Sequence, residues 1–275
     1  METIKIFLKD LLDKSESKNE LFKRNILKEY LQVLVLEFIY SHPAYSNLFF
    51  YGGSCLAHCY GLPRMSEDLD FIDANKEIKI LELASDIKSY FKKNTDLEIK
   101  TAARKFRIYL KFPVLRELGL AGKSESDLLF LKVEIFSGFD FCEKYKAELI
   151  PLFKFNKPVL IKTFDLPTLM STKIMAVLER KWEKKDKSGK ILAKVKGRDY
   201  FDLMWYLEKN INPNMDCLKG VKDKKELKEK LAAAVRKADS KSIAYDLESF
   251  IGKKDFVENL SKNIKDIIKR GLEKL

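Results

Sequence analysis

The sequence predicts an α+β protein, because strand and helix patterns are interleaved in its first part and helix patterns alone fill the second. Two observations carry this prediction: short apolar runs bounded by turn residues lie before residue 165, and apolar residues recur at helical spacing after it. We therefore expect a mixed-sheet domain with N-terminal helices over residues 1–165 and a helical domain over residues 166–275.

The expected elements follow from these patterns in chain order. The first forty residues have apolar positions at helical spacing, and residues 48–51 are typical of a short buried strand. Gly52-Gly53 forms a turn after it, and we expect Ser54 to cap the next helix. The other expected strands are 69–73, 97–102, 106–112, 128–136 and 159–164, and the expected helices are 55–60, 78–91, 169–182, 199–208, 224–237, 243–250 and 256–272.

Composition places the chain among globular proteins. Its 275 residues are 46% hydrophobic and 34% charged, with few glycines and prolines. The longest apolar segment, residues 30–40, is short and interrupted by Gln32 and Glu37, so it indicates a buried helix rather than a membrane span. The N-terminus lacks a basic region followed by an apolar one. We expect no signal peptide, no membrane contact and a cytoplasmic location.

The charge balance is strongly basic. Lysine and arginine number 53 against 41 acids, which gives a formal net charge of +12. Such a surface attracts phosphate polymers over long range. A lysine-rich composition is the alternative, since many lysines lie near glutamates in helices, as in residues 222–230.

The four cysteines are expected to be buried thiols. Cys55 and Cys59 lie one helical turn apart beside His58, but Cys142 and Cys217 do not form a second close pair. A zinc site at Cys55 and Cys59 is the alternative, although a structural zinc ion takes four ligands at tight spacing.

The turn at Gly52-Gly53-Ser54 has the composition of a phosphate-binding turn. Glycine lets the backbone approach a ligand closely, and the helix that follows points its N–H groups and positive dipole end at that ligand. The Ser54 hydroxyl adds a donor. Ordinary turn-and-cap chemistry needs the same residues, so this motif alone leaves both interpretations open.

Asp68 and Asp70 form a candidate metal site. On a strand, residues two apart point to the same face, so the two carboxylates lie side by side while Leu69 faces the core. Magnesium takes oxygen ligands and leaves room for substrate phosphates. Glu134, inside the apolar run 128–136, supplies a third carboxylate if its strand lies beside 69–73. A solvated strand end, and an ion pair of Glu134 with Lys132 or Arg107, are the alternatives.

The helical part contributes a second charged set. Lys173 and Arg180 lie two turns apart on one helix face, which suits triphosphate or RNA phosphate. Arg198 and Asp199 begin a later helix, and Asp202 follows one turn on. The alternatives are a surface lysine and an acid that complements the helix dipole.

Taken together, five motifs resemble the AbiEii-like nucleotidyltransferases, which are abortive-infection toxins of type IV within the DNA-polymerase-β-like superfamily. The match runs from residue 51 to residue 207. The matching motifs, in chain order, are Gly52-Gly53-Ser54, Arg64-Met65-Ser66-Glu67-Asp68-Leu69-Asp70-Phe71, Lys132-Val133-Glu134-Ile135, residues 172–180 and Gly197-Arg198-Asp199-Tyr200-Phe201-Asp202-Leu203.

The resemblance implies a polymerase-β-like core and magnesium-dependent transfer of a nucleoside monophosphate from an NTP, with one or two magnesium ions. It implies an active site in the cleft that the helical domain completes, an RNA acceptor such as the 3′ end of tRNA, and a cognate antitoxin. The roles it implies are metal binding by Asp68, Asp70 and Glu134, nucleotide binding by Gly53, Ser54, Arg64, Lys173, Arg180 and Arg198, and catalysis by Asp68, Asp70, Lys173, Asp199 and Asp202.

Two other functions stay open at this point. One is a nucleotidyltransferase of the same superfamily that modifies a hydroxyl group on a protein or a small molecule. The other is a non-catalytic, basic module that binds RNA or nucleotides. The +12 charge favours RNA as the acceptor over the first of these.

Overall fold

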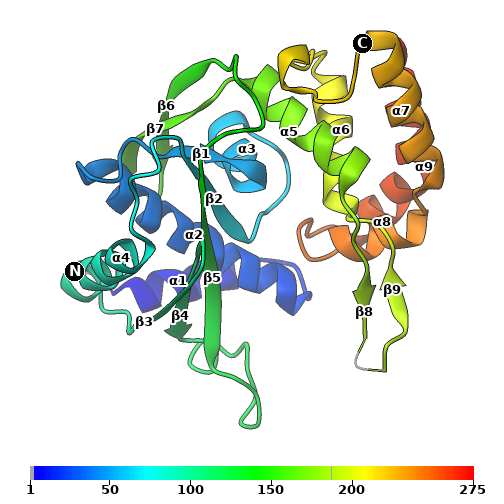
Figure 1. The fold of residues 1–275 in the computed structure, drawn as a ribbon. Helices are drawn as coiled ribbons and strands as arrows, with labels where there is room; N and C mark the ends of the chain where they lie inside the picture. The colour runs from blue at the N-terminus through cyan, green and yellow to red at the C-terminus, as the bar shows by residue number, and fades with distance from the viewer. Residues whose placement is uncertain (1–2, 187) are drawn as a thin grey trace. The chain divides into compact units, whose positions relative to one another are not determined.

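Seven strands form one mixed sheet in the order β3-β4-β5-β2-β1-β7-β6. The computed structural model describes residues 3–186 and 188–275 (Figure 1). β2 runs parallel to β5, and β1 runs parallel to β7, whereas β1 with β2, β3 with β4 and β4 with β5 are antiparallel. The bounds are β1 Phe49–Tyr51, β2 Asp68–Asp73, β3 Lys100–Arg104, β4 Arg107–Pro113, β5 Leu128–Ser137, β6 Ala147–Lys154 and β7 Lys157–Phe164.

The chain divides into two units. The first unit comprises the described residues up to Phe139 together with Glu148–Thr163, and the second comprises Asp140–Ala147 and Phe164–Leu275. The expected boundary at residue 165 lies next to Phe164. The segment Asp140–Ala147, which the sequence places in the first domain, belongs to the second unit.

Helices of the first unit pack on one face of the sheet. They are α1 Ile4–Asp13, α2 Glu20–Ser41, α3 Gly52–Tyr60 and α4 Ile80–Asn94. α2 contacts β5, α3 contacts β2, and α4 contacts β3 and β4. The expected buried helix over residues 30–40 is the second half of α2, where Leu31, Val33 and Val35 are fully buried. In the described part of the chain, no helix combines the length and the apolar character needed to cross a membrane.

The other face of the sheet is polar near its centre. The strand register pairs Asp68 with Lys132 and Asp70 with Glu134, so side chains of β2 and β5 that share this face stand next to one another. On the same face, β4 places Arg107 beside Glu134. The intervening residues Leu69 and Val133 point to the helix-covered face and are fully buried.

The second unit is mostly helical, and α6 lies at its centre. α6 packs against α5, α8 and α9, and glycines permit two of these close contacts. A Cβ atom on Gly197 would lie 2.7 Å from the Ile243 main-chain oxygen, and one on Gly271 would lie 2.7 Å from the Leu207 Cβ. The bounds are α5 Leu166–Glu179, α6 Gly197–Glu208, α7 Lys224–Lys237, α8 Ser240–Leu247, α9 Lys254–Glu273, the 3-10 helix η1 Met215–Cys217, and the hairpin of β8 Lys184–Lys185 and β9 Ile191–Ala193.

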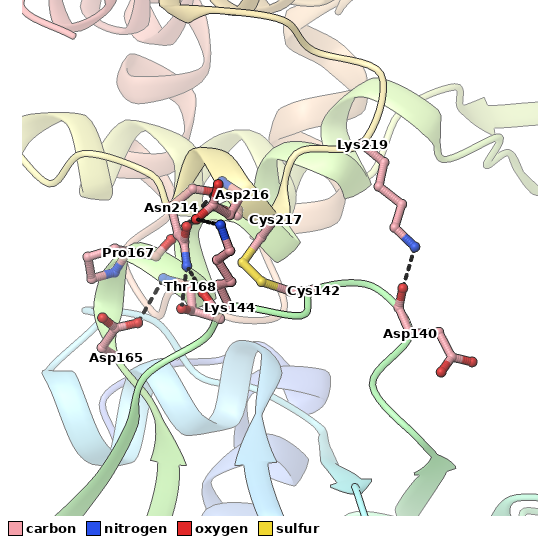
Figure 2. Close-up of a disulfide and its surroundings, with 11 residues drawn as sticks. Asp140, Cys142, Lys144, Asp165, Pro167, Thr168, Asn214, Asp216, Cys217 and Lys219 are labelled. Carbon is pink, nitrogen blue, oxygen red and sulfur yellow. Dashed lines mark hydrogen bonds and ion pairs between the residues drawn. A yellow bond between two sulfur atoms is a disulfide. The ribbon is translucent and has the colours of Figure 1, made fainter.

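The expectation of four buried thiols is wrong for two of the cysteines. Cys142 and Cys217 form a disulfide that ties the segment Asp140–Ala147 to η1 (Figure 2). The Asn214 side-chain amide also donates a 2.7 Å hydrogen bond to the Lys144 main-chain oxygen. Cys55 is a buried thiol, and Cys59 is a half-buried one. A pair 75 residues apart is brought together by tertiary folding, which the spacing of the cysteines does not reveal.

Candidate active site

The two glycines after β1 make room for the acidic strand. Gly52 has a φ of +81°, and a Cβ atom there would lie 2.5 Å from Oδ2 of Asp70. A Cβ atom on Gly53 would lie 2.8 Å from Nη2 of Arg64 and 3.0 Å from Oγ of Ser66. The contacts at 2.5 Å and 2.8 Å are shorter than those that real Cβ atoms show. Glycine is favoured at Gly52 by its positive φ, and a side chain at either position would displace the end of the Asp70 or Arg64 side chain.

Ser54 serves a different local role from the one predicted. The expectation that it caps the following helix is wrong, because α3 already begins at Gly52 and has no side-chain cap. The Ser54 side chain is fully buried, and its hydroxyl donates a short hydrogen bond to the Asp68 main-chain oxygen. This bond fixes the first turn of α3, with its positive dipole end, to the start of the acidic strand.

Asp68 and Asp70 share one face of β2, as the two-residue spacing predicts. Oδ2 of Asp68 lies 2.9 Å from Nζ of Lys132, and the Asp68 side chain is 27% exposed. Burial raises the pKa of Asp68, and the neighbouring Glu67 raises it further, while Lys132 opposes both effects. Two adjacent carboxylates near a helix N-terminus form an oxygen donor set that fits magnesium.

Glu134 lies beside Asp70 in the register, but two cations bind its carboxylate. Its Oε1 is 2.5 Å from Nε of Arg107 and 3.4 Å from Nζ of Lys132, which matches the ion-pair interpretation of this residue. Within residues 3–186 and 188–275, no group of three or more histidine, cysteine or acidic side chains is placed to hold a metal ion. Asp68 and Asp70 are thus the better donors, and Glu134 organises Arg107 and Lys132.

Arg64 is held in place by the loop that leads into β2. It is buried, and its Nη1 donates a 2.8 Å hydrogen bond to the Met65 main-chain oxygen. The Gln32 amide donates to the Ser66 main-chain oxygen, so its Oε1 accepts from Nε2 of His58 at 2.9 Å. Burial lowers the pKa of His58 to about 3, which keeps this imidazole neutral. The network fixes the loop that carries Arg64.

The second unit contains a separate charged set, here termed the helical cluster: Lys173, Arg180, Asp199 and Asp202. Nζ of Lys173 lies 2.8 Å from Oδ2 of Asp202 and 3.5 Å from Oδ1 of Asp199. Nη1 of Arg180 lies 2.5 Å from Oδ2 of Asp199. The side chain of Asp202 is fully buried and that of Asp199 is 3% exposed, whereas Arg180 is 37% exposed. The acids therefore lie beneath the cations and hold them.

Two more cations border the helical cluster. Arg198 is turned toward α8, where its Nε lies 3.3 Å from Oδ2 of Asp246 and its guanidinium stacks 3.9 Å from the Phe250 ring centroid. Lys196 was missed by sequence reasoning, since it is one lysine among many. Burial lowers the pKa of Lys196 to about 8. The positive charges of Arg198, Arg180 and Lys173 also lower it, whereas the negative charge of Asp199 raises it.

Comparison with known proteins identifies the family. Residues 37–274 match the family model described as nucleotidyl transferase AbiEii toxin, type IV toxin–antitoxin system. The chain belongs to this family. It is therefore a nucleotidyltransferase toxin, and the family implies a nucleotide substrate and a cognate antitoxin. No curated protein matches this AbiEii chain in sequence.

Two solved structures of low sequence identity align over most of the chain. MenT4, a nucleotidyltransferase toxin from Mycobacterium tuberculosis H37Rv, aligns with a TM-score of 0.57 at 11% identity, covering 96% of this chain and 89% of its own. JHP933 from Helicobacter pylori aligns with a TM-score of 0.49 at 17% identity, covering 91% of this chain and 94% of its own. The likeness to MenT4 confirms the expected polymerase-β-like fold of this AbiEii protein.

Proposed function

We propose that this AbiEii protein transfers a nucleoside monophosphate from an NTP to an RNA acceptor, with the 3′ end of tRNA as its target. The observation that carries the proposal is the placement of Asp70 directly against Gly52, with Asp68 on the same face of β2. The net charge of +12 supports a polyanionic acceptor.

In the proposed reaction, an acceptor hydroxyl oxygen forms a bond to the α-phosphorus of the NTP. The bond from that phosphorus to the oxygen bridging the β-phosphate breaks, pyrophosphate leaves, and the hydroxyl proton passes to solvent. Asp68 and Asp70 would hold magnesium, which when bound neutralises phosphate charge. The N–H groups at the start of α3 would suit phosphate oxygens of the NTP. Lys173 and Arg180 would bind phosphate oxygens through their cationic groups.

The buried acids of the helical cluster serve this reaction indirectly. We assign Asp199 and Asp202 to positioning, because their carboxylates bind Lys173 and Arg180 and are themselves buried. Arg198 also has a positioning role, because it stacks on Phe250 and pairs with Asp246 and so holds the start of α6 in place. The protein would act in the cytoplasm, where NTPs and tRNA are present, and its antitoxin would counteract tRNA modification.

The test is incubation of the purified protein with total tRNA, magnesium and each labelled NTP in turn. The Asp68→Ala/Asp70→Ala double variant is the inactive comparison, and Glu77→Gln, an exposed acid just after β2, is the matched control. Magnesium-dependent label in tRNA with the wild type and Glu77→Gln only is the expected result. Label in the protein or in a small acceptor instead of tRNA would contradict the RNA assignment, and full activity of the double variant would contradict the mechanism.

A further inference from the structure

A row of basic and aromatic side chains leads along the sheet to Asp68 and Asp70. We term it the basic-aromatic strip: Arg107, Tyr109, Lys111, Phe130 and Lys132. The register pairs Lys111 with Phe130, then Tyr109 with Lys132, then Arg107 with Glu134, and all of these side chains share the polar face of β4 and β5. The last two rungs meet Asp68 and Asp70 of β2.

The outer end of the strip is built like a stacking platform. Phe130 is 44% exposed, although its strand neighbours Leu129 and Leu131 are buried on the helix-covered face. Nζ of Lys111 lies 5.7 Å from the Phe130 ring centroid. An exposed ring next to a cation matches the aromatic and cationic groups that hold single-stranded nucleic acid.

The inner end of the strip reduces the repulsion that a polyanion would meet at the acids. Lys132 binds both Asp68 and Glu134, and Arg107 binds Glu134 and lies 4.6 Å over the Phe106 ring. Four residues separate the outer rung from the inner one, which is about 13 Å along the strands. That length covers about four nucleotides at the 3.4 Å spacing of a stacked strand.

We infer that the basic-aromatic strip binds the single-stranded end of the RNA acceptor and delivers its terminal hydroxyl to Asp68 and Asp70. Phe130 and Tyr109 stack on bases, and Lys111 contacts the phosphate backbone. The inference rests on the proposed function, and it names the acceptor surface, which the motifs leave unassigned. Positive charge along the strip favours a polyanion such as RNA over a neutral small molecule or a peptide with few acidic residues.

The experiment measures binding without catalysis. A short single-stranded RNA with a fluorescent 5′ end is titrated, without NTP or magnesium, against wild type, Phe130→Ala and Lys111→Ala. We expect Phe130→Ala to weaken binding about 10-fold through lost stacking. We expect Lys111→Ala to lower the slope of log affinity against log salt by about 0.7.

Two variants control for charge and for an exposed ring. Lys92→Ala removes an exposed lysine from α4, on the helix-covered side, and Phe153→Ala removes a ring that is 80% exposed on β6. Both should bind the RNA as the wild type does. Equal weakening by these controls, or unchanged binding by both strip variants, would overturn the inference.

The proposed function and the strip fail in different ways. Wild type that binds the RNA through the strip, yet labels no RNA in any NTP, would contradict the proposed function and uphold the strip. If the wild type labels RNA and the strip variants bind and label it equally well, the proposed function is upheld and the role of the strip is contradicted. If Phe130→Ala instead weakens binding of a fluorescent NTP by the same factor as RNA, the strip holds the nucleotide and the inference is wrong.

Discussion

The charged sets of the two units differ in how their acids are surrounded. In the first unit, Asp68 lies on the polar face of the sheet, is 27% exposed and has Lys132 as its ion-pair partner. In the second unit, Asp202 is fully buried and pairs with Lys173. Asp199 is almost fully buried and pairs with both Lys173 and Arg180. Under the proposed function, the first arrangement would present carboxylates to a ligand, whereas the second uses them to hold cations.

Under the proposed function, this difference separates reactive acids from positioning acids that look alike in the sequence. A buried carboxylate paired with a cation is costly to remove, because the remaining charge is left buried and uncompensated. A partly exposed carboxylate crowded by another acid costs little to neutralise and can even relieve repulsion. Stability measurements therefore distinguish the two sets independently of activity.

The largest effect on stability is expected from Asp202→Asn. Loss of this carboxylate removes the 2.8 Å partner of the largely buried Lys173 ammonium and leaves the longer 3.5 Å contact with Asp199, so we expect about 3 kcal/mol of destabilisation. Asp70→Asn should change stability by less than about 1 kcal/mol. Urea denaturation followed by circular dichroism measures both, and equal effects of the two substitutions would erase the proposed distinction.

The disulfide gives the next largest effect, and it is confined to the second unit. Replacing Cys142 and Cys217 by alanine should lower stability by about 2–4 kcal/mol, because the cross-link restricts a loop of 75 residues in the unfolded chain. Reductant should destabilise the wild type to the level of this variant and leave the variant unchanged. A wild type insensitive to reductant, with its thiols shown to be reduced, would refute this role.

A smaller loss of stability with a large loss of activity is expected from Gly52→Ala. The new Cβ would strain a φ of +81° and clash with Oδ2 of Asp70, so we expect about 1–3 kcal/mol of destabilisation and loss of transfer. Gly61→Ala is the matched control, since Gly61 has a φ of +72° and no atom within 4 Å of the new Cβ. It should lose similar stability and keep transfer; inactivity of both variants would show that strain alone explains the result.

The smallest effect concerns pH and Lys196. Its ammonium has a pKa of about 8, so the charge is present below that pH and is lost as the pH rises through it. If Lys196 joins Lys173 and Arg180 in binding phosphate, the KM for NTP should rise by about 10-fold per pH unit above 8. Lys196→Arg should remove this rise, because guanidinium stays charged. A KM that rises identically in the variant would exclude Lys196.

Local periodicity predicted the parts of the site that lie on one element. The two-residue spacing of Asp68 and Asp70 places them on one face, and the apolar positions around Gln32 predict a buried helix; both features are found. Glu134 illustrates a limit. The sequence left metal binding and ion pairing open, and only the register of β4 and β5 puts Arg107 and Lys132 on its carboxylate.

Features that depend on distant parts of the chain were missed. The disulfide joins residues whose separation carries no pairing signal. β6 was not expected, because Pro151 interrupts its pattern and its exposed residues are apolar; proline is tolerated there since β6 is an edge strand. The short hairpin of β8 and β9 lies between the expected helices 169–182 and 199–208, where no strand was expected. Lys196 became recognisable only from its burial beside other cations.

The most direct test of the account is the rate of magnesium-dependent label transfer from NTP to tRNA by Asp70→Asn, measured beside the wild type at equal folded protein. The account predicts a loss of at least about 10³-fold, with a melting temperature close to that of the wild type. A variant that folds like the wild type and transfers label within a few-fold of its rate would contradict the assignment of Asp68 and Asp70 as the reactive centre.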